Sequence, residues 1–304
     1  MTVLIAYLVV VLTWSTTPLA IVWSSESIDP ILAAFLRMAI AAMLGMVALL
    51  LFRLKLSWHK PALQVYGYSL LGVFGSMLCS YLAARYLASG LMSLLFGLSP
   101  ILSGLIAQKL INEPKFGPVR WSAIVISLFG LAVICTDGVY LEDKGWIGIC
   151  LILFAVLLFS ISGVLIKKVD ANLNPLVTTV GTLLLSLPLY FLTWVFFGGE
   201  LNYEAWQPKA IISVLYLGVF GSFLAFIAYF YILNKLSAST VTLVTLITPV
   251  IAITLGTLLN NEPLNSSLVL GALCVLVGLA LYIWHSKVKR MFTKSKTVQH
   301  PTEY

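Results

Sequence analysis

The sequence predicts an all-α integral membrane protein whose ten transmembrane helices form two inverted five-helix repeats. Three observations carry this prediction. The 304-residue chain is 61% hydrophobic and only 10% charged, whereas a soluble domain carries about 25% charged residues. Uncharged runs of about 20 residues, the length that crosses a bilayer core, follow one another along most of the chain. In addition, one long motif occurs twice, 149 residues apart.

The repeated motif reads SPILSGLIAQKLINEP at 99–114 and TPVIAITLGTLLNNEP at 248–263. In each copy small residues recur every fourth position, which places them on one helix face. Such a stripe lets another helix come close in lipid. A second motif, LGVFGS, occurs at 71–76 and again at 217–222. The chain therefore consists of two copies of one unit.

Ten apolar runs of membrane-spanning length are predicted, with ends defined to within a few residues. The ten spans are 3–23, 30–52, 64–86, 89–111, 118–136, 145–167, 174–197, 208–233, 237–259 and 265–284. We assign 3–136 to the first repeat and 145–284 to the second, and 286–304 to a polar cytoplasmic tail that we expect to be disordered. The first run has no basic start and no small-residue cleavage site, so we expect it to be retained as a span.

The basic residues predict the orientation of the chain. With the amino terminus in the cytoplasm, fourteen of the eighteen Lys and Arg residues lie inside and three lie outside. The remaining one, Arg37, falls within a span. Such an asymmetry is a strong positive-inside signal, and an even number of spans then places both termini in the cytoplasm. We expect the plasma membrane, of the bacterial inner-membrane kind, and the basic tail fits an anionic inner leaflet without any nucleic-acid partner.

Five spans in each repeat is an odd number, so the second repeat enters the membrane from the opposite side. Inverted repeats are a common plan of secondary transporters, which bind their solute near the midplane between the repeats. The four cysteines lie scattered in apolar runs, and the three histidines lie in loops or the tail. We therefore expect no disulfide, metal or cofactor, and we find no buried nucleophile and base for an enzyme.

Span 1 carries Trp14, Thr16 and Thr17 next to Pro18 near its middle. Trp14 is the only tryptophan deep in a span, and a proline there frees a backbone carbonyl. Span 6 has an aromatic and hydroxyl-rich stretch at the matching place, with Ser160 and Ser162. Two interpretations stay open: these residues line a polar cavity, or span 1 is a kinked packing helix.

Arg37 lies about seven residues from the predicted outer end of span 2. A charge inside a span is costly and usually marks a cavity or a partner. No Asp or Glu lies in the interior of a span. Arg37 therefore either faces an aqueous vestibule, where it would attract a carboxylate-bearing solute, or is a structural residue bonded to backbone carbonyls.

Spans 3 and 8 carry polar aromatic residues near their ends. Tyr81 and Arg85 follow the first LGVFGS motif, and Tyr229 follows the second. A tyrosine at such a depth can bridge an apolar wall and a polar solute. It can equally be an interface anchor, and both interpretations stay open.

Spans 4 and 9 hold the repeated motif that begins with Ser99 and Thr248. Proline follows each of them, and a proline inside a helix removes a hydrogen bond. Matching prolines in the two halves of a transporter point to its binding site and hinges, although simple kinks are the alternative. The hinge candidates are Pro100 and Pro249, and the gate or helix-end candidates are Glu113 and Glu262.

These residues resemble the drug/metabolite transporter superfamily in its EamA-type ten-helix form. The matching features are Trp14-Ser15, the Pro30–Arg37 spacing, and a proline followed 13 residues later by a glutamate in each half. The resemblance covers residues 3–284 and implies a basket in which helices 1, 3, 4, 6, 8 and 9 surround a central cavity, with helices 5 and 10 outside. It also implies export or exchange of small metabolites such as amino acids. The Phe159-Ser160 pair departs from the usual pattern of span 6.

The function that we predict is secondary transport, by alternating access, of small polar or amphipathic metabolites that are amino-acid-like or drug-like. The expected partners are a small-molecule substrate and the lipid bilayer, and a homodimer is compatible with the sequence. The alternative is a non-transporting sensor or assembly subunit of the membrane. We expect the following residues to line the cavity: Trp14, Thr16, Thr17, Arg37, Tyr81, Arg85, Ser99, Ser160, Ser162, Tyr229 and Thr248.

Overall fold

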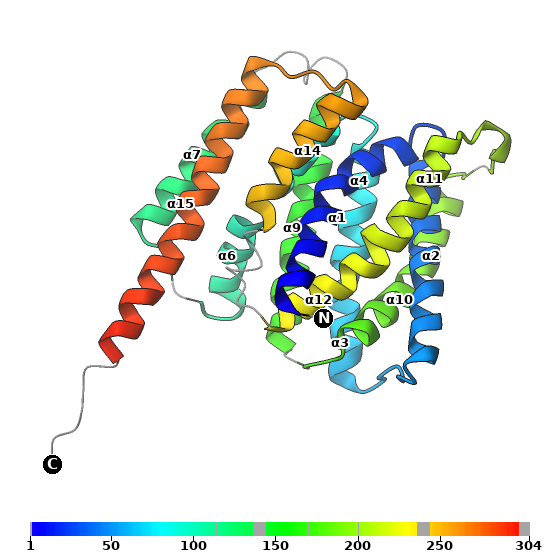
Figure 1. Cartoon of the computed structure of the whole chain (residues 1–304), viewed down its shortest axis with the longest axis horizontal. Coiled ribbons are helices and arrows are strands. Elements are labelled where there is room, and N and C mark those ends of the chain that lie inside the picture. The colour runs from blue at the N-terminus through cyan, green and yellow to red at the C-terminus, as the bar shows by residue number, and fades with distance from the viewer. Residues whose placement is uncertain are drawn as a thin grey trace.

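The computed structural model of the chain is a bundle of long helices that run up and down side by side (Figure 1). It describes residues 2–113, 115–135, 144–169, 171–199, 201–235 and 244–297. No strand occurs in these ranges. The predicted all-α membrane fold is therefore confirmed.

The first half contains the following helices: α1 (Val3–Ser24), α2 (Pro30–Leu51), α3 (Lys60–Leu70), the π-helix η1 (Leu71–Ser76), α4 (Met77–Ala83), α5 (Ser89–Phe96), α6 (Ser99–Leu110) and α7 (Pro118–Cys135). The second half contains α9 (Gly145–Val169), α10 (Pro175–Phe196), the short 3₁₀ helix η2 (Tyr203–Ala205), α11 (Pro208–Tyr216), the π-helix η3 (Leu217–Leu224), α12 (Ala225–Lys235), α14 (Val244–Asn260) and α15 (Ser266–Thr297).

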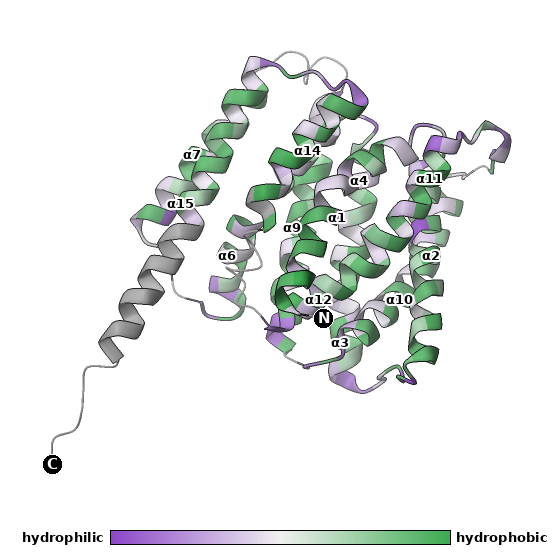
Figure 2. Cartoon of the chain, in the orientation of Figure 1, coloured by the Kyte–Doolittle hydropathy of each residue, from purple (hydrophilic) through white to green (hydrophobic). Residues whose placement is uncertain are grey.

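The helices have the length and polarity of membrane spans. Within the described ranges, seven helical segments are long and apolar enough to cross a bilayer, and three shorter apolar helices cover Pro118–Ile134, Ile247–Asn260 and Ser266–Tyr282. Figure 2 shows apolar residues along the shafts and polar residues gathered at the two ends of the bundle. Many large apolar side chains, such as Leu50 and Leu258, are exposed on the outside. In water that surface would be unfavourable, but it suits contact with lipid.

The same local chemistry starts the second span of each repeat. The side chain of Asp29 accepts hydrogen bonds from the backbone N–H groups of Ile31 and Leu32 at 3.0 and 3.1 Å. Asn174 accepts the equivalent bond from Leu176 at 2.9 Å. A proline follows each of the two capping residues. An acceptor before a helix and a proline in its first turn are the ordinary start signals of a helix.

The LGVFGS motif forms a π-helical segment in both halves, as η1 and as η3. A π-helix inside a longer helix is uncommon and frequently marks a functional site. Its glycines also allow close packing. A Cβ added at Gly72 would lie 3.2 Å from the hydroxyl of Ser162, and one at Gly218 would lie 2.7 Å from the side chain of Ile40.

The prolines of the repeated motif lie in different surroundings in the two halves. Pro100 stands in the first turn of α6, after a break at Gly97 that separates α6 from α5. Pro249 stands inside α14. The residues that precede α14, 236–243, lie outside the described ranges, and so does Pro114.

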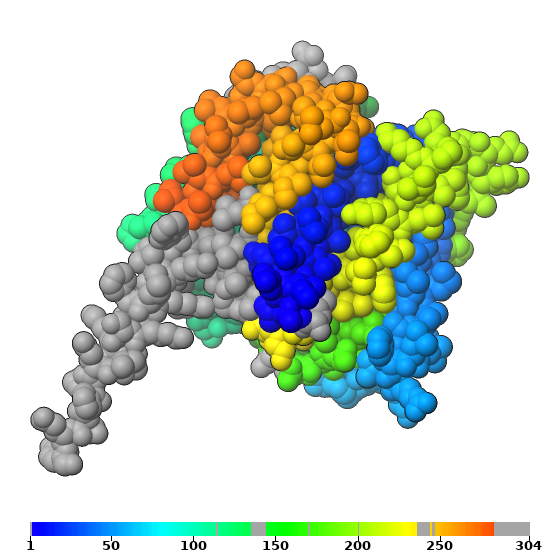
Figure 3. All heavy atoms as spheres, viewed as in Figure 1, coloured from blue at the N-terminus to red at the C-terminus, as the bar shows by residue number. Residues whose placement is uncertain are grey.

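Helices α7 and α15 pack against each other at one flank of the bundle (Figure 1). Glycines allow this close approach: a Cβ at Gly130 would lie 2.6 Å from the carbonyl oxygen of Gly271, and one at Gly278 would lie 2.6 Å from that of Ala123. In the middle of the view, α1 lies between α14 and the continuous α11–α12 rod (Figure 3). Segments of the two repeats therefore interleave around α1.

Helix α15 continues beyond the predicted end of its span, to Thr297. The expectation of a disordered tail beginning at Ser286 is therefore wrong as far as 297. The basic run after Trp284 is compatible with a helix, because Lys and Arg are good helix formers. Residues 298–304 lie outside the described ranges.

Candidate functional site

A cavity of about 90 Å³ lies in the middle of the bundle and is lined by both repeats. Its walls come from α1, α2, the α3–η1–α4 rod, α5, α6, α9, η3, α12 and α14. The lining is mostly apolar, with a few hydroxyl groups and one charged residue, which is the usual character of a small-molecule site. Seven of the predicted cavity residues line it: Trp14, Thr17, Arg37, Ser99, Ser162, Tyr229 and Thr248.

Four other predicted residues lie outside this lining. Thr16 forms a 2.6 Å hydrogen bond with the hydroxyl of Tyr216 on α11. Arg85 pairs with Asp29 at 2.9 Å near the surface. Tyr81 is fully buried in the core, and Ser160 donates a hydrogen bond to the carbonyl of Ser99 at 3.2 Å. Successive residues of a helix point in different directions around its axis. Thr16 therefore faces away from the cavity that its neighbour Thr17 lines.

The aromatic part of the cavity is a cluster from three helices. The ring centroids of Trp14 (α1), Phe159 (α9) and Tyr229 (α12) lie 5.4–5.6 Å from one another. Phe96, at the end of α5, lies 6.2 Å from Phe159. These distances are typical of favourable aromatic pairs. The matching aromatic positions of spans 1 and 6 are thus brought into contact.

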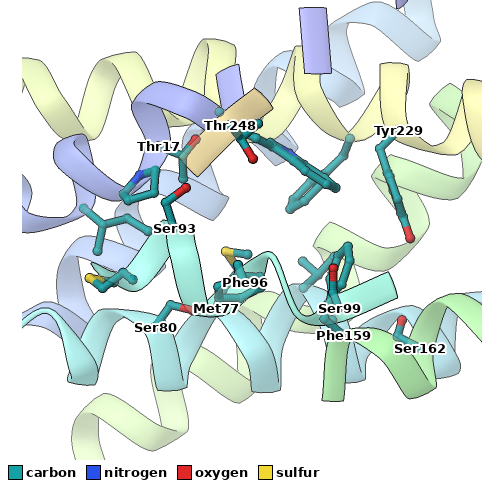
Figure 4. Close-up of a pocket in the computed structure, with 18 of the residues that line it drawn as sticks. Thr17, Met77, Ser80, Ser93, Phe96, Ser99, Phe159, Ser162, Tyr229 and Thr248 are labelled. Atoms are coloured by element: carbon teal, nitrogen blue, oxygen red, sulfur yellow. The ribbon is translucent and has the colours of Figure 1, made fainter. Parts of the chain in front are cut away.

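Hydroxyl groups line the cavity around this cluster (Figure 4). Thr17, Ser80 and Ser69 donate their hydroxyl hydrogens to carbonyls of their own helices at 2.6–2.8 Å. Ser93, Ser99, Ser162 and Thr248 carry hydroxyls that form no side-chain hydrogen bond within the described part of the chain. These last four groups are available to a solute.

Arg37 is the charged residue of this lining, and only 1% of its surface is exposed. Its Nε donates to the hydroxyl of Ser222 at 2.6 Å, and its Nη2 donates to the carbonyl of Gly221 at 2.8 Å. Both partners belong to η3 in the other repeat. Its Nη1 is buried and has no hydrogen-bond partner among the described residues. Features of both sequence interpretations therefore occur together: Arg37 binds a carbonyl and also borders the cavity.

The first π-helix is held by an equivalent contact. The hydroxyl of Tyr190, on α10, donates to the carbonyls of Val73 and Phe74 in η1 at 2.7 and 3.3 Å. A π-helical turn leaves backbone carbonyls that need donors in a membrane. In each case the donor comes from the second span of the other repeat. Arg37 and Tyr190 therefore fix the two π-helices against the opposite halves.

A second cavity, of about 270 Å³, lies at the end of the bundle where α9 and α12 terminate. It shares Ile166 and Phe230 with the central cavity and is lined by polar residues that include Asn172, Thr178 and Asn234. This end also holds the start of α1 (Figure 1), and we call it the N-terminal end. The two cavities adjoin at Ile166 and Phe230.

The opposite end, which we call the Glu262 end, is held by a hydrogen-bond network between the repeats. The carboxylate of Glu262 accepts from the backbone N–H groups of Ser89 and Gly90 at 2.9 and 3.1 Å. It also accepts from the Asn260 amide at 3.3 Å, whose oxygen in turn accepts from the indole of Trp23 at 2.8 Å. Glu262 thus caps the first turn of α5 and connects it to α14 and α1, with the negative charge at the favourable end of that helix.

The Asn-Glu pair of the repeated motif ends its helix in the same way in both copies. Asn112 and Asn261 have positive φ values of 52° and 50°. The N–H groups of Glu113 and Glu262 then donate back to the carbonyls of Ala107 and Gly256 at 3.3 and 3.1 Å. This is the left-handed helix ending that asparagine tolerates. It explains why the motif recurs, and it places a glutamate just beyond each helix.

The two glutamates nevertheless differ in their surroundings. Glu113 is exposed, whereas Glu262 is partly buried. A Cβ at Gly256 would collide with the Glu262 carboxylate. In the first copy Ala107 occupies the position that matches Gly256. A methyl group therefore stands where the carboxylate of Glu113 would have to lie in an equivalent contact.

Sequence reasoning missed several lining residues, notably Ser93 and Phe96 on α5 and Gly221 in η3. The LGVFGS echo marks Gly221, but a repeat alone does not separate packing from binding. Ser93 and Phe96 precede the break at Gly97. A single glycine is the only sequence feature of that break, and it does not predict that the residues before it line a cavity. Nor do the described residues contain a group of three or more His, Cys, Asp or Glu side chains able to hold a metal.

Comparison with known proteins places these features in a family. The model of the EamA-like transporter family matches residues 1–136 and again residues 146–284. An uncharacterized transporter of Archaeoglobus fulgidus is 28% identical over 274 residues, which cover 89% of this chain and 94% of the relative. The uncharacterized transporter YvbV of Bacillus subtilis is 24% identical, over 94% of this chain and 92% of that protein.

A solved crystal structure shares the fold. It superposes with a TM-score of 0.67 over 91% of this chain and 96% of its own, with 19% sequence identity. The two family matches cover both halves of the chain, and together with the doubled motifs and the shared cavity they leave one assignment: the chain belongs to the EamA-like transporter family.

Proposed function

We propose that this membrane transporter exports or exchanges small amphipathic metabolites by alternating access through the central cavity. The solute enters from the N-terminal end, which the basic residues predict to be cytoplasmic. It leaves at the Glu262 end after the two repeats have moved against each other.

One observation carries this proposal: the central cavity is built by both repeats, and its two ends differ. At the N-terminal end it adjoins a polar second cavity through Ile166 and Phe230. At the other end Glu262 connects α14 of one repeat to α5 of the other. A transporter waiting for solute on one side has this asymmetry, because alternating access requires one end to be held while the other admits the solute.

The proposed motion uses the breaks in spans 4 and 9. The α5–α6 break at Gly97 and Pro100 and the proline of α14 remove helix hydrogen bonds beside the cavity. Helices bend most easily at such positions. Pro100 and Pro249 are therefore our hinge candidates, and Glu262 is the gate at its end. Glu113 has no contact equivalent to that of Glu262, since it is exposed.

The proposed mode is facilitated diffusion or exchange. Proton-coupled carriers commonly use carboxylates or histidines inside the membrane. Among the described residues that line the two cavities, none is Asp, Glu or His. Export should therefore persist when the proton gradient is dissipated, and a collapse of transport on adding an uncoupler would contradict this mode.

The experiment compares the metabolites in the medium of cells that make the wild-type protein with those of cells making Arg37→Ala or an empty vector. Protein abundance in the membrane is matched. We expect one class of compounds to accumulate outside only with the wild type, since Arg37 both holds η3 and borders the cavity. Purified protein in liposomes then tests whether the same compounds cross without other proteins.

The matched control is Arg53→Gln, which removes an exposed arginine just after the other end of α2. We expect this variant to export like the wild type. Identical media from wild-type and empty-vector cells, together with no flux in liposomes, would contradict the transport function. That result would favour the alternative of a sensor or assembly subunit.

A further inference from the structure

We propose that the solute of the central cavity is an amphipathic monocarboxylate anion, whose carboxylate pairs with the guanidinium group of Arg37. This inference rests on the proposed function and names the substrate class of the same site. A carboxylate with an apolar or aromatic body fits better than a cation, a neutral alcohol or a zwitterion.

The first argument is the unfinished bonding of Arg37. The guanidinium is 1% exposed, and its Nε and Nη2 are occupied by Ser222 and Gly221. Both partners are neutral, so they leave the positive charge unpaired. Nη1 is buried without a partner among the described residues. A buried charge without a counter-ion costs several kcal/mol, and an anion in the cavity would relieve this cost.

The second argument is the sign of the charges around the cavity. Arg37 is the charged residue of the central lining, and no described lining residue is acidic. The carboxylates of the described residues lie at helix ends or in loops: Glu26, Asp29, Glu113, Glu204 and Glu262. The cavity therefore offers one cation to a carboxylate but no carboxylate to an ammonium group. This combination favours a net anion over a zwitterion or an amine.

The third argument is the shape of the remaining lining. Trp14, Phe159 and Tyr229 form the aromatic cluster, with centroids 5.4–5.6 Å apart. Aromatic rings pack well against a flat apolar body. Ser93 and Thr248 carry hydroxyls that are free of side-chain hydrogen bonds within the described part of the chain, and they can donate to a second carboxylate oxygen.

Gly221 lines the cavity beside the guanidinium of Arg37. A Cβ added there would lie 3.2 Å from Nη2 of Arg37 and 3.4 Å from the hydroxyl of Thr17. A methyl group at this position would crowd the surroundings of the guanidinium while leaving the charge in place. Gly221→Ala therefore tests the space beside the guanidinium while the positive charge of Arg37 is kept.

The test measures the binding of four ligands that share one phenyl ring and differ only in their polar group. They are 3-phenylpropionate, phenylalanine, phenethylamine and 3-phenylpropanol. Binding to the purified full-length protein in detergent is measured calorimetrically, so that it does not depend on flux. We expect 3-phenylpropionate to bind roughly tenfold more tightly than each of the other three, as a charged hydrogen bond allows.

Two variants locate this preference. Arg37→Gln should bring the carboxylate down to the affinity of the alcohol, and Gly221→Ala should weaken the carboxylate more than the alcohol. The matched control is Gly67→Ala, because a Cβ at Gly67 meets no other atom within 4 Å; it should bind all four ligands like the wild type. If Arg37→Gln does not fold, the ligand series and Gly221→Ala decide the question.

The inference is overturned if the alcohol, the amine or phenylalanine binds as tightly as the carboxylate, or if none of the four binds. Equal losses for all four ligands in Gly221→Ala would also overturn it. Flux in liposomes is read separately. Binding of the carboxylate without any solute flux supports the inference and contradicts the transport function. Flux of other solutes without binding of the carboxylate supports the transport function and contradicts the inference.

Discussion

Neutralising Glu262 should open the Glu262 end of the bundle. In the Glu262→Gln variant the side chain keeps its size but loses the charge that accepts hydrogen bonds from Ser89, Gly90 and Asn260 at 2.9, 3.1 and 3.3 Å. These contacts join α14 to the first turn of α5 in the other repeat. The variant should therefore weaken the closed state of this end and leave the helices themselves intact.

The expected magnitude follows from the two backbone bonds. A hydrogen bond to a charged group contributes about 1.5–3 kcal/mol, and a neutral one contributes about 0.5–1.5 kcal/mol. Losing the charge therefore costs about 1 kcal/mol for each bond. Glu262 is only partly buried, so water replaces some of this loss and we expect about 1–2 kcal/mol in total. With about 1.4 kcal/mol for each factor of ten, the open fraction should rise roughly 5- to 30-fold.

The assay follows the labelling of one cysteine by a membrane-impermeant thiol reagent added from the Glu262 side. Ile21→Cys is the reporter, since Ile21 lines the cavity on α1 and is 2% exposed. It is placed in a background that lacks Cys79, Cys135, Cys150 and Cys274. The initial labelling rate reports how often this end opens, and it should rise 5- to 30-fold in Glu262→Gln.

Glu113→Gln is the matched control, because it changes the same motif in the other copy, where the carboxylate is exposed. It should leave the labelling rate at the wild-type value. An unchanged rate in Glu262→Gln, or an equal rise in both variants, would refute the assignment of Glu262 as the contact that holds this end.

Three further predictions follow from single contacts. Gly256→Ala should increase Ile21→Cys labelling as Glu262→Gln does, because the new methyl collides with the carboxylate, whereas Ala107→Gly should not. Tyr190→Phe should lower thermal stability in detergent by about 1–3 kcal/mol, since it leaves one buried and one partly buried carbonyl of η1 without this donor; an unchanged melting temperature would contradict this role. Arg85→Gln should lower the free energy of unfolding by at most about 1 kcal/mol and leave export unchanged, because the side chains of Arg85 and its partner Asp29 are 48% and 31% exposed. Loss of export in this variant would show that Arg85 takes part in transport.

The sequence predicted the helices well because membrane spans are long and uniformly apolar. The bounds of α2 and α10 follow from a capping residue and a proline, and these signals are local. The π-helices were not predicted. Six residues of LGVFGS carry no pattern that separates a π-turn from an α-turn, and the donors that hold the turns, Arg37 and Tyr190, come from the other repeat.

The candidate site was predictable where a polar or aromatic residue stood deep in an apolar span. Trp14, Arg37 and Tyr229 line the cavity for that reason. The direction of a side chain around its helix was less predictable. Thr16 and Thr17 are neighbours, yet Thr16 binds Tyr216 and Thr17 lines the cavity. A helix that is apolar on all sides has no polar face in its sequence pattern that would predict which side chains point into the cavity.

The role of Glu262 shows a third limit. The sequence indicated that both glutamates end a helix, and it treated the two copies alike. The contact of Glu262 depends on a glycine one turn and a half earlier and on the N-terminus of α5 in the other repeat. Only the assembled bundle shows that the two ends differ.

The most direct measurement of alternating access is a reversible lock across the Glu262 end. A Cβ at Gly90 lies 3.4 Å from the Cβ of Ile253, close to the separation of a disulfide. Gly90→Cys and Ile253→Cys are combined in the background without native cysteines, and efflux from liposomes is measured for the solutes that the export experiment identifies. Efflux that stops on oxidation and returns on reduction, with each single variant active throughout, is the predicted result. If the disulfide is fully formed and efflux continues as fast as in the protein with reduced cysteines, transport by alternating access through this cavity is contradicted.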